Sequence, residues 1–201
     1  MSSLAVKDGT GEGYSARVDS GHNLHTFSRV ISEKKQATED GESYNINTGI
    51  ITLTNAVDTP LLYLKNNESK DFHIDLIVFY MGTSTGGTAT LGAQYTVIRN
   101  PTTGTIITST PTDAPMESNA NFGSNNTVTI DAYIGATGDT MTDGSDHAVI
   151  KNSLLSRIEA PLDVVLTNGA SIGVKVKPPT SNTSVETYCA ILGHFKNSDH
   201  I

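Results

Sequence analysis

Residues 72–81 read FHIDLIVFYM, and this stretch decides the fold. Apolar side chains recur at every second position, which is the period of a β-strand. On that period, one face of the strand carries Phe72, Ile74, Leu76, Val78 and Tyr80. The other face carries Ile77 and Phe79, so we expect both faces of this strand to be covered.

Weaker runs with the same alternation lie on both sides of this stretch, separated by Gly, Asn and Pro turns. They occupy residues 50–54, 61–65, 89–99, 128–132, 162–166, 172–176 and 185–193. The Asn168 and Gly169 pair is expected to close a hairpin between two of them. Roughly eight to ten strands at this spacing, with no helical segment long enough for a parallel crossover, predict an all-β, antiparallel, jelly-roll-like β-sandwich.

Three segments do not fit this pattern. Residues 109–126 carry almost no apolar side chains, and residues 135–147 are polar as well. Both are expected to be long loops, which in compact domains are usually functional or disordered. Residues 148–157 are ambiguous between a strand and a short helix.

Residues 1–44 differ from the rest of the chain. They are rich in Gly and charged residues, and few apolar residues recur at any period. Such a segment cannot bury itself, so we expect an extended N-terminal arm that becomes ordered only against something else. The expected organisation is therefore an arm over residues 1–44 and a sandwich domain over residues 45–201.

The composition limits the kinds of partner. The chain has 201 residues and a formal net charge of −8, which repels phosphate backbones and argues against nucleic acid. No apolar stretch approaches the ~20 residues of a membrane span, and no signal peptide opens the chain, so we expect no membrane partner and synthesis in the cytoplasm. Hydrophobic residues make up 36%, so the core is expected to be thin and to gain from burial between subunits.

The histidines and the single cysteine do not predict a metal site. His22 and His25 stand in H-x-x-H spacing, but a metal site needs more ligands, and we expect a solvated or interface pair. His73 is expected on a half-exposed strand face, and His194 and His200 in a solvated tail. Cys189 lies in an apolar run and is expected to be buried and inert.

Residues 139–147 resemble a calcium loop in part. Asp139, Asp143 and Gly144 fit positions 1, 5 and 6 of an EF-hand loop. Met141 stands at position 3, and Ile150 stands at position 12, where a bidentate Glu is required. The segment therefore predicts a turn rich in Asp and Gly, and no metal site.

The other motifs in the sequence lack residues or flanking elements that a catalytic or cofactor site requires. The glycines at positions 9, 11 and 13 lack the flanking strand and helix of a dinucleotide-binding fingerprint. The chain has no Gly-x-Ser-x-Gly nucleophile elbow. Asp163 and Glu186 are no better candidates for a glycosidase dyad than other carboxylates. We therefore expect no enzyme, no catalytic residue and no cofactor.

Five stretches of the chain resemble structural proteins of tailed-bacteriophage virions, in particular minor head and decoration (cement) proteins. They are residues 44–54 (YNINTGIITLT), 61–68 (LLYLKNNE), 99–107 (RNPTTGTII), 119–124 (NANFGS) and 169–179 (GASIGVKVKPP). The resemblance implies a jelly-roll-like subunit on the capsid surface that binds the major capsid protein and sister subunits, as a homodimer or homotrimer. On this interpretation the polar arm becomes ordered along the shell or along a sister subunit.

A second hypothesis is a host-surface, glycan-binding module of a head fibre or tail. The two polar loops at residues 109–126 and 135–147 motivate it. The chain has no Trp, so Tyr14, Tyr44 and Tyr133 are the available aromatic platforms, although Tyr in strands is more often half-buried packing.

Overall fold

The computed structural model of the chain describes residues 32–54, 57–83, 92–108, 116–152, 157–178 and 184–196. The chain divides into two units, Met1–Ser32 and Glu33–Ile201, and apart from Ser32 the described residues belong to the second. The expected N-terminal arm lies outside the described residues up to residue 31. Its last part, residues 33–44, belongs to the second unit, where it forms a helix and the beginning of a strand.

Two short helices and twelve strands make up the described part of the chain. In order they are α1 (Glu33–Glu39), β1 (Ser43–Asn47), β2 (Ile51–Thr54), β3 (Thr59–Asn66), β4 (Phe72–Thr83), β5 (Ala93–Arg99), α2 (Thr105–Thr108), β6 (Met116–Asn119), β7 (Ile130–Ile134), β8 (Ser145–Asn152), β9 (Arg157–Ala160), β10 (Val164–Leu166), β11 (Ser171–Lys177) and β12 (Ser184–Phe195). The ambiguous segment after residue 147 is therefore a strand, β8, and residues 116–119 of the first expected loop form β6.

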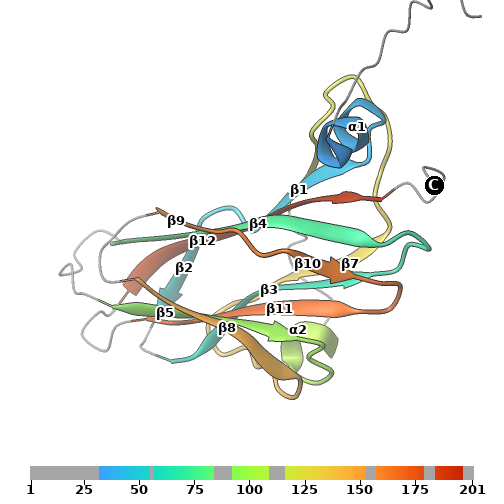
Figure 1. The fold of residues 1–201 in the computed structure, drawn as a ribbon. Helices are drawn as coiled ribbons and strands as arrows, with labels where there is room; N and C mark the ends of the chain where they lie inside the picture. Colours follow the sequence, from blue (N-terminus) through green and yellow to red (C-terminus); the bar gives the residue numbers. More distant parts are fainter. Residues whose placement is uncertain are drawn as a thin grey trace, which may run out of the picture. The chain divides into compact units, whose positions relative to one another are not determined.

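The strands pair as one long hairpin folded back on itself. β1 and β2 pair with β12, β3 with β11, β4 with β9 and β10, and β5 with β8, all antiparallel. Two further pairings, β4 with β12 and β5 with β11, join these pairs into the two facing sheets of Figure 1. This is the strand order of a jelly roll, with β6 added beside β1 and β7 added beside β3. The predicted all-β, antiparallel sandwich is confirmed.

A β-bulge at Asp75 divides β4 into a short first part and a longer second part. Ile74 pairs with Gly193 and Leu76 pairs with Leu192, so Asp75 has no β12 residue opposite it. One inserted residue moves every later side chain to the other face of a sheet. The core therefore receives Phe72, Ile74, Ile77, Phe79 and Met81. The predicted single face of alternating residues is wrong beyond Ile74, and Tyr80 is 38% exposed.

The predicted hairpin at Asn168 and Gly169 is also wrong. β10, which precedes the turn, pairs with β4, whereas β11, which follows it, pairs with β3 and β5. The turn therefore carries the chain from one sheet to the other. Periodicity indicates that a segment is a strand but leaves open which sheet it joins.

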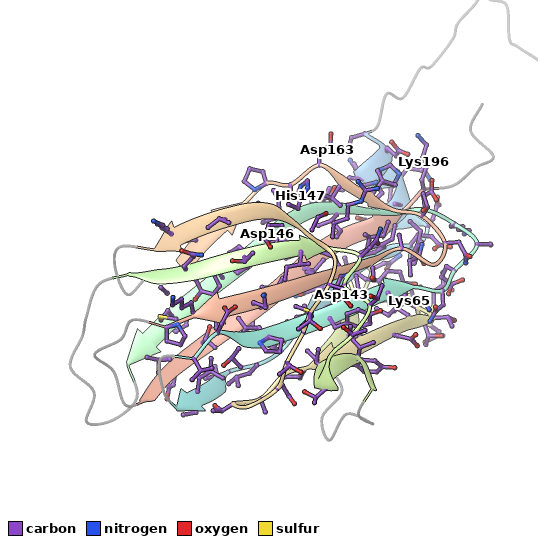
Figure 2. All side chains as sticks on the ribbon, turned by 90° about the horizontal axis from the view of Figure 1, so that it is seen from below. Lys65, Asp143, Asp146, His147, Asp163 and Lys196 are labelled. Carbon is purple, nitrogen blue, oxygen red and sulfur yellow. The ribbon has the colours of Figure 1, made fainter. Side chains whose placement is uncertain are left out.

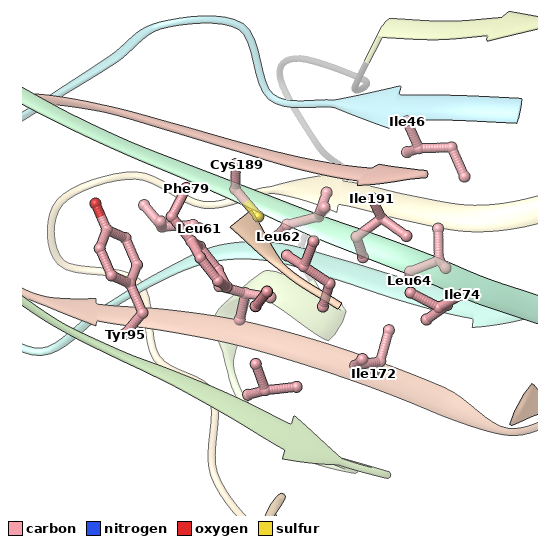
Figure 3. Close-up of a cluster of buried hydrophobic side chains, with 14 of the residues drawn as sticks. Ile46, Leu61, Leu62, Leu64, Ile74, Phe79, Tyr95, Ile172, Cys189 and Ile191 are labelled. Atoms are coloured by element: carbon pink, nitrogen blue, oxygen red, sulfur yellow. The ribbon is translucent and has the colours of Figure 1, made fainter. Parts of the chain in front are cut away.

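The space between the sheets is filled by side chains from both (Figure 3). Phe79 of the seven-stranded sheet stacks on Tyr95 of the five-stranded sheet, with ring centroids 4.6 Å apart. The Tyr95 hydroxyl donates a hydrogen bond to the Tyr80 carbonyl, 3.0 Å away, which satisfies the polar end of a buried ring. Cys189 is fully buried in this core, as predicted.

A second, smaller cluster covers the outer face of the five-stranded sheet. Ile106 of α2 and Met141 of the β7–β8 loop pack with Tyr63 and Ile98 of the sheet. The loop over residues 135–144 is thus anchored by a side chain that is only 3% exposed, that of Met141. Gly173 leaves room for this side chain, since a Cβ there would overlap the Met141 sulfur.

We predict that Gly193→Ala destabilises the fold by about 2–3 kcal/mol, because an added methyl group overpacks a filled core. A Cβ at this position would lie 2.6 Å from Phe72 Cζ and would overlap the His73 carbonyl oxygen. Urea unfolding measures the effect. Gly123→Ala is the control, because its Cβ would meet nothing closer than 3.5 Å. Equal stability of the two variants would contradict the packing described for β4 and β12.

We also predict that stability falls as the pH rises above about 8.5, where an unfolded cysteine begins to lose its proton. Burial raises the pKa of the Cys189 thiol and of the Tyr95 hydroxyl. Between pH 9 and 10.5 the unfolded chain therefore binds fewer protons than the folded one, and the free energy of unfolding decreases with pH. Cys189→Ala removes up to one proton from the difference in proton binding between the folded and unfolded chain. The decrease of the free energy of unfolding with pH should therefore become less steep by up to about 1.4 kcal/mol per pH unit. Identical slopes in urea titrations would count against the burial of this thiol.

Candidate functional site

The most elaborate polar structure on the described surface joins the turn after β6 to the end of α1. α1 ends at Glu39, and Gly41, which has a φ of +73°, lets the Glu42 amide donate to the Ala37 carbonyl just beyond that end. The carbonyl groups just beyond such an end lack intrahelical partners. Three Asn side chains donate hydrogen bonds to these carbonyl groups. The pairs are Asn121 with Glu39 O (3.0 Å), Asn126 with Asp40 O (3.2 Å) and Asn119 with Gly41 O (2.7 Å).

The same side chains shape the turn itself. Asn119 Oδ1 accepts a hydrogen bond from the Asn121 amide, and Asn121 Oδ1 accepts one from the Gly123 amide. The Ser124 amide donates to the Asn121 carbonyl at 2.9 Å. Asn favours such positions because its short carboxamide both accepts from the backbone two residues on and donates elsewhere. We call residues 119–126 the Asn-braced turn.

Phe122 stands at the tip of the Asn-braced turn and is 98% exposed. The turn lies against the end of α1, where the backbone carbonyls of Glu39 and Asp40, two residues with exposed side chains, accept hydrogen bonds from Asn121 and Asn126. The turn is thus a hydrogen-bonded support for one exposed apolar ring.

Beneath the other end of α1, the structure brings together two of the histidines discussed above. The His73 and His194 rings stack with centroids 5.4 Å apart, and His194 Nδ1 lies 3.3 Å from Asp75 Oδ2. The same carboxylate oxygen is 3.2 Å from Lys34 Nζ of α1. His194 is 5% exposed, and its Nε2 has no hydrogen-bond partner among the described residues. The expected solvated position of His194 is therefore wrong, because β12 continues to Phe195; His73 is half-buried, as expected.

A groove of about 370 Å³ opens between the sheet edges formed by β8 and β10. Val97, Val164 and Ile172 contribute apolar surface to it. His147 and Asp163, which lie on the same side of the sandwich in Figure 2, belong to its polar lining. A second pocket, of about 410 Å³, lies beside the Asn-braced turn and is crossed by the Lys70–Glu42 ion pair at 2.8 Å.

The carboxylates of the partial calcium loop hold neighbouring segments in place. Asp143 Oδ2 accepts a hydrogen bond from the Thr103 hydroxyl at 2.7 Å. Asp139 accepts one from the Thr105 hydroxyl at 2.9 Å and another from the Ala136 amide at 2.7 Å. These bonds fix the loop against the beginning of α2.

Other predicted positions are not brought together. Asp163 precedes Val164, which pairs with Ile74, whereas Glu186 pairs with Gly82 at the far end of β4. Ile74 and Gly82 are eight residues apart along β4, a distance of roughly 25 Å. Asp163 and Glu186 are therefore too far apart to form a carboxylate dyad. Tyr44 is buried and Tyr133 is half-buried against Tyr63, so neither is an open aromatic platform. His22, His25, Tyr14 and His200 lie outside the described residues.

Searches over the described ranges add two findings. In that part of the chain no group of three or more His, Cys, Asp or Glu side chains is placed to hold a metal ion. None of the helices described there has the length and apolar character needed to cross a membrane.

No family model matches the chain, and no curated protein matches it.

The Asn-braced turn was not predicted from the sequence, although residues 119–124 carry part of the resemblance described above. One local signal was available, because Asn at 119 and again at 121 is typical of consecutive side-chain-capped turns. The docking of these side chains onto a helix about 80 residues earlier, as between Asn121 and Glu39, leaves no local trace in the sequence.

We predict that Asp75→Ala destabilises the fold by about 1–3 kcal/mol, because it leaves the buried His194 ring without the one hydrogen-bond partner seen here. Lys34→Ala is the matched control on the same carboxylate. Its side chain is 55% exposed, so its ion pair is expected to contribute less than about 1 kcal/mol. Urea unfolding at pH 7 measures both, and equal losses would show that His194 does not depend on Asp75.

Proposed function

We propose that the chain is a non-enzymatic structural protein of a tailed-bacteriophage virion. On this proposal it is made in the host cytoplasm and lies on the capsid surface, where it decorates or cements the head. Its partners are the major capsid protein and sister subunits, in a homodimer or homotrimer. The observation that carries the proposal is that Asp and Asn side chains, which could serve in a catalytic or metal site, instead form hydrogen bonds that hold two loops against the jelly roll.

Two braced loops support this interpretation. Asp139 and Asp143 hold the β7–β8 loop to Thr105 and Thr103, and the Asn carboxamides hold the turn after β6 to α1. A loop that is ordered before binding loses little conformational entropy when it docks. Such loops suit a protein that presents a fixed surface to neighbours in a shell.

Cementing needs nothing beyond binding. A ligand that binds only the assembled shell stabilises it by mass action, and the effect grows with the ratio of its concentration to its dissociation constant. A specific interface of ordinary size buries about 1,600 Å² in total. A jelly roll with a thin core also gains stability when part of its surface is buried against sister subunits.

The test is co-sedimentation with heads built from the major capsid protein of the same genome and lacking this chain. We expect saturable binding at a fixed ratio to capsid subunits, together with heads that withstand higher temperatures. Binding that is absent or does not saturate would sink the proposal. A variant without residues 1–30 tests the expected arm separately, because unchanged occupancy would exclude the arm from shell binding.

A glycan-binding role is the second candidate, and the exposed Phe122 ring in the first polar loop favours it, since apolar ring faces stack on sugars. A glycan array with the purified chain decides between the two. Selective binding to one glycan class, without binding to heads, would favour the second candidate.

A further inference from the structure

We infer that the Asn-braced turn is a docking projection, and that Phe122 inserts into an apolar pocket with a basic rim on the partner protein. This inference rests on the proposed function, in which that partner is the capsid shell. It names the part of the surface that makes the contact and the chemistry that receives it.

The first argument is that folding gives no reason for an aromatic residue at position 122. The side chain is 98% exposed, whereas the other large exposed apolar side chains that the structure describes range from 38% for Tyr80 to 69% for Ile50. The turn is made by backbone groups and by its Asn and Ser residues, so a polar side chain at this position would serve it equally. A fully exposed phenyl ring gains free energy only when something else covers it.

The second argument is that the backbone that carries the ring is held in place before binding. The turn is fixed to α1 through Asn121 and Asn126, and α1 is fixed to the sheet by ion pairs of Lys34 with Asp75 and of Glu33 with Lys196. A rigid aromatic anchor loses little entropy on docking, and a few such anchors dominate the energetics of most interfaces.

The third argument concerns the chemistry of the partner. Glu39 and Asp40 stand exposed beside the turn, and the chain as a whole carries a net charge of −8. Charge complementarity therefore calls for Lys or Arg around the receiving pocket. The same net negative charge disfavours insertion of the ring into an anionic lipid surface. A protein pocket is favoured over a sugar because a ring exposed on all sides can be enclosed by a pocket, whereas a sugar covers one face.

The test compares binding of full-length variants to heads that lack the chain. Phe122→Ala is expected to weaken binding about 10- to 100-fold, the range for loss of one buried aromatic side chain from an interface. Its thermal unfolding should match that of the unchanged protein, because the ring supports no part of the fold. Phe122→Leu, which keeps an apolar anchor, should recover most of the affinity.

Two further variants separate the anchor from its support. Ile50→Ala removes another exposed apolar side chain, at 69% exposure, and is expected to bind like the unchanged protein. Asn121→Ala keeps the ring but removes its brace, and is expected to bind several-fold more weakly. Raising the salt concentration should weaken binding of the unchanged protein, because the rim is charged.

The outcomes separate this inference from the proposed function. If the unchanged chain does not bind heads, the proposed function fails. If it binds and Phe122→Ala binds equally well, only the docking projection is overturned. Loss of self-association in Phe122→Ala, with binding to heads unchanged, would make a sister subunit the occupant and overturn the assignment to the shell. Loss of glycan binding alone would overturn it in the same way.

Discussion

The pairing of β4 with β12 is the constraint on which the rest of the structure depends. These two strands, each 12 residues long, run side by side through the seven-stranded sheet. The bulge that interrupts them places Asp75 where it meets both His194 and Lys34. Lys34 and the Glu33–Lys196 ion pair hold α1, and the end of α1 receives the Asn-braced turn. The bulge between β4 and β12 thereby helps to set the position of the turn that carries Phe122.

The polar residues that lower the hydrophobic fraction of the chain to 36% also form hydrogen bonds that brace its loops. Asn side chains complete the end of α1, and Thr hydroxyls bond the carboxylates of the β7–β8 loop. Each such bond contributes only about 1 kcal/mol, so their value lies in defining conformation as much as in stability. The same residues that lower the hydrophobic fraction of the chain therefore hold its long loops in fixed positions.

Much of the fold could be predicted from the sequence, and the failures have physical causes. The alternation in β11 and β12 depends on neighbouring residues, so it can be recognised from the local sequence. The bulge at Asp75 could not be predicted, because residues 76–79 are all apolar and satisfy either register. β6 carries too few apolar residues to show a period, and it forms because β1 offers an open edge. The Asn-braced turn and the stacked histidines join segments about 80 and 120 residues apart, and no local pattern encodes such contacts.

We propose that this chain acts by holding a preformed surface against a capsid shell. An electron-microscopy reconstruction of heads carrying the chain tests it most directly, because it locates every subunit at once. The account predicts a jelly roll on the outer surface of the capsid, with the tip of the Asn-braced turn buried in the shell. Subunits absent from the head, or bound with Phe122 facing solvent, would contradict it.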